Sequence, residues 1–167
     1  MIMRGLKVPS FYRFMFKEIV RELLQNYLNE RSDLFLIDFE ILSGNIIRIV
    51  VDGDNGVLVE DCMMISRAIE HNLDKDEYDF SLEVSSAGAY STLTNTRQYA
   101  KNIGRVLSIE TNLENYEAKL IEANDEDIKL KWKQRQPKKI GKGKITVEKE
   151  INILYKDINE AKVKIKF

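Results

Sequence analysis

The chain has 167 residues, of which 44% are hydrophobic and 32% are charged, and its formal net charge is −1. This composition is typical of a soluble globular protein, and the length suits one large domain or two small ones. It excludes a helical membrane protein, because no apolar run approaches the roughly 20 residues that cross a bilayer.

The first predicted element is an amphipathic helix over residues 11–30. Pro9-Ser10 is typical of a helix start with Ser10 as the N-cap, and apolar residues then recur at helical spacing as far as Leu28. The preceding residues 1–7 have no apolar h-region and no small-residue cleavage site, so we expect no signal peptide.

Two strands joined by a hairpin are predicted next, at residues 34–41 and 46–51. Gly44-Asn45 between them is typical of a tight turn. Strict alternation in the first strand predicts Leu34 on one face of the sheet and Phe39 on the other.

A second helix over residues 59–73 and a third strand over residues 80–84 complete the first half of the chain. The helix start lacks a good N-cap, although Glu60 and Asp61 lie favourably near the positive end of the helix dipole. The resulting α-β-β-α-β order predicts a small α+β domain with both helices on one face of a three-stranded sheet.

The stretch from Ile49 to Leu93 carries a set of residues at fixed spacings. In order they are Asp52, Gly56-Val57, Glu60-Asp61-Cys62, Ser66-Arg67-Ala68-Ile69, Leu82-Glu83-Val84-Ser85-Ser86 and Ala87-Gly88. This pattern resembles the family of ribosome maturation factors called RimP, which help the small ribosomal subunit to assemble.

The resemblance implies a fold and structural roles for several residues. It implies an N-terminal domain related in outline to KH-type folds and a C-terminal barrel of the Sm-like or SH3-like kind. The positions that carry over as family-signature, structural residues are Asp52, Gly56, Asp61, Glu83, Ser85, Ser86 and Gly88.

The chain departs from the family pattern just after the third strand. Ala87 stands where the family has Pro, and Tyr90-Ser91-Thr92 stands where it has Asp-Arg-Pro. These differences remove two rigid φ angles and a possible ion pair. Gly88 is free to take a positive φ in this loop, which we expect to be the domain boundary.

The second half predicts a short helix over residues 94–104 and then five closely spaced strands, at 105–111, 116–123, 127–135, 144–154 and 161–167. Short strands of this kind suggest a small, strongly bent antiparallel barrel. We therefore expect two domains, residues 1–88 and residues 89–167.

The two halves differ in charge. Residues 1–88 carry 9 Lys/Arg and 16 Asp/Glu, a net of −7, whereas residues 89–167 carry 17 and 11, a net of +6. The basic half is the better candidate for a nucleic-acid partner.

The cations concentrate between Ile128 and Val147, where there are eight basic residues and no acidic one. They are Lys129, Lys131, Lys133, Arg135, Lys138, Lys139, Lys142 and Lys144. The first four alternate with Leu130 and Trp132, so a strand would hold the cations on one face and the apolar side chains in the core. We expect this run to bind ribosomal RNA through its phosphates, and the alternative is an ordinary solvated face.

The last strand alternates in the same way, with Lys162, Lys164 and Lys166 on one face. Here the solvated-face interpretation is the favoured one. Trp132 is expected in the core rather than as a platform for a stacked base.

Asp52 to Gly56 invites a calcium interpretation, which fails because Val57 and Met63 occupy the Gly and Glu positions of an EF-hand loop. The turn is expected to face water or to cap the helix, and its carboxylates could alternatively face a basic ribosomal protein. His71 is the single histidine and has no second ligand candidate, so we expect no metal and no cofactor.

Catalysis finds little support in the residues. Cys62 lies on the apolar face of its helix, and Ser85 and Ser86 have no assignable base. Cys62 is also the single cysteine, which excludes an internal disulfide and suits a reducing cytoplasm.

We therefore expect a cytoplasmic, monomeric, non-enzymatic assembly factor whose partners are the RNA and one protein of the small ribosomal subunit, with no membrane contact. The first alternative is a general RNA-binding protein or RNA chaperone whose Sm-like barrel forms a ring. The second is an enzyme that uses the acidic turn and a metal.

Overall fold

The structure is a computed structural model that describes residues 10–165, and the chain divides into two compact units between Ala87 and Gly88. We call them unit 1 and unit 2 and describe each by itself. Unit 1 contains α1 (Ser10–Glu30), β1 (Leu34–Leu42), β2 (Ile46–Gly53), α2 (Val59–Glu70) and β3 (Ser81–Ser86). The predicted α-β-β-α-β order and the α+β class are confirmed. Pro9, part of the predicted helix start, lies outside the described residues.

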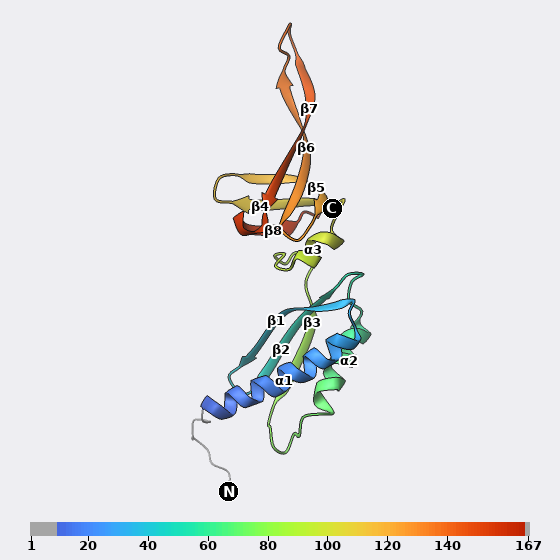
Figure 1. The fold of residues 1–167 in the computed structure, drawn as a ribbon, viewed down its shortest axis with the longest axis vertical. Helices are drawn as coiled ribbons and strands as arrows, with labels where there is room; N and C mark the ends of the chain where they lie inside the picture. The colour runs from blue at the N-terminus through green and yellow to red at the C-terminus, as the bar shows by residue number, and fades with distance from the viewer. Residues whose placement is uncertain (1–9, 166–167) are drawn as a thin grey trace. The chain divides into compact units, whose positions relative to one another are not determined.

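The sheet of unit 1 has the strand order β1-β2-β3 (Figure 1). β1 and β2 form an antiparallel hairpin in which Gly44 and Asn45 have φ values of +80° and +55°. The loop between the paired residues Leu42 and Ile46 has three residues, and Gly and Asn adopt the positive φ that its last two positions require most readily. β2 and β3 are parallel, and α2 makes the connection between them.

A β-bulge in β1 breaks the alternation that the sequence predicts. The pairing register with β2 shifts between Leu36 and Asp38, so Ile37 is an extra residue in the strand. Phe39 consequently packs against the same core cluster as Leu34. The prediction that Phe39 lies on the opposite face is wrong, because one extra residue turns every later side chain over.

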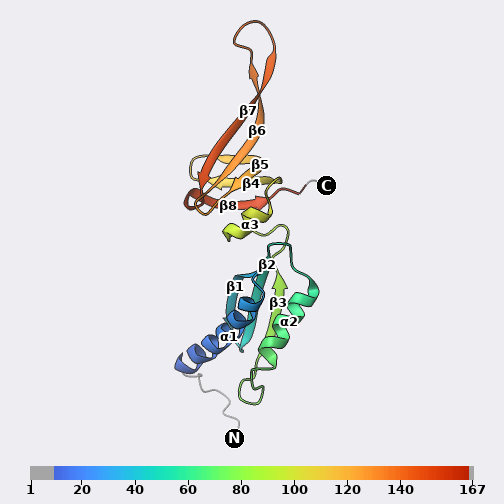
Figure 2. The ribbon, with the colours of Figure 1, turned by 45° about the vertical axis from the view of Figure 1, so that its right-hand side comes forward.

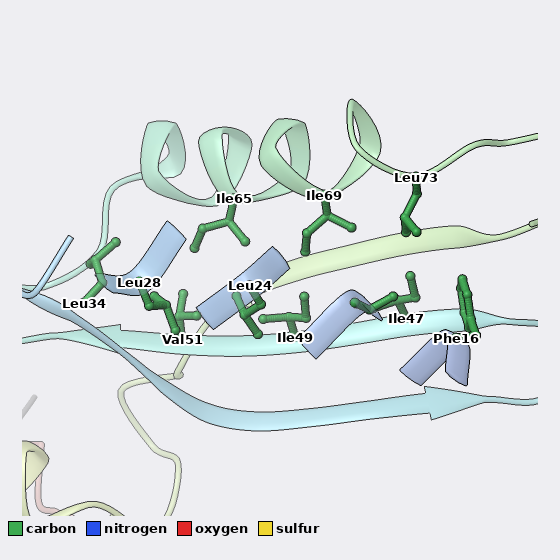
Figure 3. Packing of buried hydrophobic residues seen from close by; sticks show 11 residues of the cluster. Phe16, Leu24, Leu28, Leu34, Ile47, Ile49, Val51, Ile65, Ile69 and Leu73 are labelled. Atoms are coloured by element: carbon green, nitrogen blue, oxygen red, sulfur yellow. The ribbon is translucent and has the colours of Figure 1, made fainter. Parts of the chain in front are cut away.

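One hydrophobic core joins both helices to one face of this sheet. Leu24 of α1 and Ile65 of α2 point toward the same side of β2, where Ile47 and Ile49 are fully buried (Figure 3). Each such side chain contributes roughly 1.5–3 kcal/mol through burial. The apolar spacing of the two helices is therefore what attaches them to the sheet.

Unit 2 is a short helix followed by an antiparallel sheet. Its elements are α3 (Thr96–Lys101), β4 (Val106–Thr111), β5 (Asn115–Ala123), β6 (Asp127–Pro137), β7 (Lys144–Leu154), the 3-10 helix η1 (Tyr155–Asp157) and β8 (Ile158–Val163). The strand order is β7-β6-β5-β4-β8 (Figure 2). Five strands are present as predicted, but the last one, predicted at residues 161–167, runs from Ile158 to Val163 directly after η1, and residues 166–167 lie outside the described range.

The expectation of a closed barrel is not met among residues 10–165. β8 returns to pair with β4, and no ladder joins it to β7, so β7 and β8 are the two edges of the sheet. A second core lies on one face of this sheet and includes Leu107, Leu120 and Leu130, all fully buried.

β6 and β7 extend beyond the other strands of unit 2 as a two-stranded ribbon (Figure 1). β5 pairs with β6 only as far as Lys131, whereas β6 and β7 pair with each other from Asp127–Leu154 to Pro137–Lys144 without a register shift. We call residues 132–149 the arm. Its end is closed by a hydrogen bond from the Lys138 amide to the Gly143 carbonyl, at 3.0 Å.

No helix within the described range combines the length and the apolar character needed to cross a membrane.

Candidate nucleic-acid interface

The predicted row of cations on β6 is confirmed as geometry. Lys129, Lys131, Lys133 and Arg135 occupy alternate positions in an unbroken ladder, so they share one face of the strand. Leu130, on the other face, is fully buried.

Part of this row is neutralised by neighbouring strands, which the sequence does not reveal. The Lys131 ammonium lies 3.0 Å from a Glu148 carboxylate oxygen and 3.9 Å from Glu150, both on β7. Lys129 lies 3.6 Å from Glu122 on β5. The interpretation that no carboxylate balances the run is therefore wrong for these two lysines. The antiparallel pairing brings Glu148 and Glu150 of β7 beside Lys131, although they are almost 20 positions away in sequence. It brings Glu122 of β5, on the other side of one turn, beside Lys129.

The Lys131–Glu148 pair also changes the acidity of both groups. The hydrogen bond from Lys131 and its positive charge lower the pKa of Glu148, and the same contact raises the pKa of Lys131. Both ions are thus held in their charged forms at neutral pH, and they largely cancel each other as seen by a distant phosphate.

The arm carries the remaining positive charge. It contains seven basic residues and one acidic residue, Glu148, a net of +6. Since residues 89–167 carry 17 basic and 11 acidic residues, the rest of that half holds ten of each and is neutral. The whole excess positive charge of the basic half therefore lies on the two-stranded ribbon.

The outer cations of the arm are exposed and lack carboxylate partners. In the described part of the chain no ion pair involves Arg135, Lys138, Lys139, Lys142 or Lys144, and all five side chains are exposed. Ile140, between them at the end of the arm, is 92% exposed. The arm can therefore contact an anionic surface from its end as well as from one face.

The lysines at the end of the chain differ from those of the arm. Lys162 is ion-paired with Glu160 at 3.0 Å, and Lys164 is ion-paired with Glu117. These contacts agree with the interpretation of an ordinary solvated face for β8. Lys166 lies outside the described residues.

Two carboxylates at the acidic turn of unit 1, those of Asp52 and Asp61, are buried. Asp52 is only 5% exposed and accepts a hydrogen bond from the Gly53 amide at 2.8 Å. Asp61 accepts one from the Leu58 amide at 2.8 Å, which satisfies a free donor at the start of α2. The bond to Asp61 agrees with the favoured expectation that a carboxylate of this turn caps the helix, and Asp52 and Asp61 both hold the turn rather than being presented to a partner. Asp54 and Glu60 are exposed.

Two further residues hold this turn, and sequence reasoning missed them. The Arg31 guanidinium binds Asp33 through two nitrogens and Asp61 through a third, all at 2.9 Å. These bonds raise the pKa of Arg31. A single sequence gives no signal for a contact between residues 30 positions apart.

Gly53 is the other missed residue. A Cβ there would clash with the Gly56 carbonyl and would come within 3.0 Å of the Leu34 side chain. The close approach of two backbone segments thus requires glycine at this position. Gly56 itself has a φ of +89°, which accounts for its place among the signature residues.

The other signature residues lie on β3 and just beyond it. Glu83 is opposite Arg48 in the parallel ladder and 3.4 Å from it, and Arg48 also binds Glu40 at 3.0 Å. Ser85 and Ser86 are exposed at the end of the strand.

The loop after β3 does not use the freedom expected of Gly88. Gly88 is not among the described residues with positive φ, and a Cβ at this position would meet the Ser91 hydroxyl at 3.1 Å. The backbone of this loop thus forms without the positive φ that glycine would permit at this position. Close packing with the following turn, rather than a left-handed backbone, distinguishes this glycine.

The described residues contain no group of three His, Cys, Asp or Glu side chains that could hold a metal ion. His71 is the C-cap of α2 and is exposed. Cys62 packs against the core of unit 1, and burial together with the charge of Asp61 raises the pKa of its thiol. A raised thiol pKa disfavours the reactive thiolate.

Known proteins resemble the chain over nearly its whole length. A model of the RimP N-terminal domain matches residues 24–90. A ribosome maturation factor RimP from Christiangramia forsetii is 55% identical over 153 residues, which are 92% of this chain and 100% of the relative. The chain belongs to the RimP family.

Two other family members extend the comparison. A RimP from Flavobacterium psychrophilum is 53% identical over 91% of this chain and 99% of the relative. One from Porphyromonas gingivalis is 34% identical over 87% of this chain and 95% of the relative. The matches extend well beyond unit 1, and the resemblance stated from the signature residues is confirmed. The chain is thus related to ribosome maturation factors along both units.

Proposed function

We propose that this chain is a non-catalytic assembly factor that binds the immature small ribosomal subunit and promotes its maturation in the cytoplasm. Membership of the RimP family supports ribosome maturation as the process. The choice of the small subunit follows from what the family resemblance implies, and the mode of binding follows from the charge of unit 2.

The observation that carries the mode of binding is the separation of charge within unit 2. The arm has a net charge of +6 while the remaining part of residues 89–167 is neutral. Ribosomal RNA presents a dense array of phosphates, and Lys and Arg bind them with little dependence on base sequence. The arm would therefore bind the phosphate backbone of RNA.

The eight cations that the sequence predicts as the binding site divide into two roles under this proposal. Arg135, Lys138, Lys139, Lys142 and Lys144 would contact phosphates directly, with Lys133 at the edge of the group. Lys129 and Lys131 would contribute less, because each is already within 4 Å of a carboxylate.

We propose that the two units are separate domains with the boundary after residue 88. Each has its own core cluster, which supports independent folding. Unit 1 would be KH-like in outline. Unit 2 would be a Sm-like barrel left open, since its helix precedes five antiparallel strands and the last pairs with the first. Each unit expressed alone should unfold cooperatively.

The chain would act as a monomer, with a ribosomal protein and ribosomal RNA as its partners. Lys144, Glu148, Lys149 and Glu150 along β7 place charge on an exposed sheet edge, which discourages the edge pairing that a ring requires. A mass of one chain in solution would support this state, and a stable ring would favour the RNA-chaperone alternative.

Sedimentation tests the function. The chain should travel with free small subunits and be absent from translating ribosomes, and a variant with Arg135, Lys138 and Lys139 changed to Glu should lose this association while keeping its circular dichroism spectrum. Co-sedimentation of the variant at the wild-type level would reject the arm as the RNA-binding site. Equal amounts of the wild-type chain on translating ribosomes would reject the assembly role.

A further inference from the structure

The root of the arm contains a hollow of about 380 Å³ with mixed aromatic and polar walls. β5 contributes Tyr116 and Glu117 to it, and the two strands of the arm contribute Trp132, Gln134 and Lys149. Small-molecule sites have volumes of about 300–1,000 Å³, so this hollow suits a single planar group rather than a folded surface.

Two aromatic rings give the hollow an apolar wall. The centroids of Tyr116 and Trp132 are 5.9 Å apart, with an angle of 58° between the rings. Trp132 packs against the core of unit 2 and is half-buried, so part of its ring remains open to the hollow. The core packing fixes the indole in place, and a fixed, partly open aromatic ring is a surface on which a nucleobase can stack.

The polar groups around these rings match the edge of a base. The exposed Gln134 amide can both donate and accept hydrogen bonds. Glu114 adds a carboxylate that also accepts from the Tyr116 hydroxyl, and Glu117 is held by Lys164. Carboxylate acceptors pair with the amino groups of adenine, cytosine and guanine, which uracil lacks.

The position of the hollow relates it to the arm. Lys149 lies directly opposite Trp132 in the ladder, so a cation stands beside the aromatic wall. The same ribbon carries the net charge of +6 that draws a phosphate backbone toward unit 2. Trp132 and Gln134 lie on the face of β6 opposite Lys133 and Arg135, and β5 does not pair with β6 beyond Lys131. An RNA strand bound at the end of the arm would therefore reach the hollow by passing around the free edge of β6.

We propose that this hollow binds one unpaired RNA base, stacked on Trp132, with a preference for bases that carry an exocyclic amino group. The inference rests on the proposed function in one respect, namely that the arm holds RNA. It adds a site for unpaired nucleotides, so that the chain distinguishes single-stranded segments of an immature RNA from paired ones.

The single tryptophan of the chain makes the test specific, because all tryptophan emission comes from residue 132. The probes are a hexamer of adenylate RNA, a hexamer of uridylate RNA and an abasic hexamer with the same number of phosphates. The adenylate hexamer should quench the emission and bind about 5- to 150-fold more tightly than the abasic one, the range that one stacked base gives. Uridylate should fall between them.

Variants separate the hollow from the arm. Trp132→Leu should reduce the adenylate-to-abasic affinity ratio to about one, measured by anisotropy of labelled oligonucleotides, whereas Trp132→Phe should retain most of it. Neutralising Arg135, Lys138 and Lys139 should weaken binding of all three probes and leave the ratio unchanged. Because Trp132 also packs in the core, Gln134→Ala at an exposed position provides a second variant, and it should reduce the preference for adenylate over uridylate.

The outcomes distinguish this inference from the proposed function. An adenylate-to-abasic affinity ratio of one in the wild-type chain, with intact co-sedimentation with small subunits, would reject base binding in the hollow. It would leave the assembly role unaffected. Quenching by an arginine-containing peptide and not by any oligonucleotide would assign the hollow to a protein side chain and would equally overturn the inference. Loss of co-sedimentation with a retained ratio would reject the assembly role alone.

Discussion

Neutralising the outer arm should change the salt dependence of RNA binding in a calculable way. The variant combines Arg135→Gln, Lys138→Gln and Lys139→Gln, which lowers the net charge of the arm from +6 to +3 and adds no negative charge. All three residues are exposed and have no ion pair in the part of the chain that the structure describes, so the fold should not change. Only phosphate contacts are removed.

The magnitude follows from counterion release. If each unit of net charge neutralises one phosphate, the slope of log affinity against log salt should be about −4.2 to −5.4 for the wild-type chain and about −2.1 to −2.7 for the variant. Between 50 and 200 mM salt the wild-type affinity should then fall about 300- to 2,000-fold. The affinity of the variant should fall only about 20- to 40-fold over the same range.

Fluorescence anisotropy with a labelled ribosomal RNA fragment, at four or five salt concentrations, measures both slopes. The matched control removes three exposed cations from elsewhere in unit 2, through Arg105→Gln, Lys119→Gln and Lys156→Gln, none of which has an ion pair within the described residues, and it should keep the wild-type slope. Equal slopes for the arm variant and the wild-type chain would refute the assignment of phosphate binding to the arm. A control variant that loses as much slope as the arm variant would show that total charge, and not its placement, governs binding.

Three further predictions concern stability. Leu24→Ala should lower the free energy of unfolding by about 2–5 kcal/mol, because Leu24 is 1% exposed in the core of unit 1, whereas Leu113→Ala, at a side chain that is 93% exposed, should change it by less than about 0.5 kcal/mol; urea denaturation compares them. Gly53→Ala should cost about 1–3 kcal/mol through the clash with the Gly56 carbonyl, and an unchanged urea midpoint would contradict the close approach described for this turn. Burial raises the pKa of Tyr99 to about 12 from an ordinary value near 10, so its contribution to stability is complete below about pH 10 and is lost as the pH rises through 12. Tyr99→Phe should remove this alkaline loss, and the same pH profile in both proteins would exclude Tyr99 as its source.

The elements of the fold could be predicted from local patterns because each depends on neighbours in sequence. Helical spacing located α1 and α2 within a few residues, and Gly44-Asn45 located the first hairpin. The bulge at Ile37 could not be predicted, because an extra residue leaves the composition of a strand unchanged and is fixed only by its partner strand.

The arrangement of the candidate site along one strand could be predicted, but the contacts between neighbouring strands could not. The alternation along β6 correctly separates Lys131 from Leu130, since a strand alone determines it. Whether Lys131 has a carboxylate beside it depends on the register of β7, which places Glu150 opposite. The buried position of Asp61 likewise depends on Arg31, which directly follows the end of α1.

The regular ladder of the arm gives it a length that can be altered independently of the rest of unit 2. Because the pairing from Asp127–Leu154 to Pro137–Lys144 contains no bulge, removing two opposed residue pairs would shorten the ribbon by about 7 Å without exchanging its faces. Homologues and engineered forms could thus vary the reach of this projection in fixed steps, while the sheet at its base keeps the same core. In such a series the distance that the ribbon projects from the sheet becomes a quantity that can be set residue pair by residue pair.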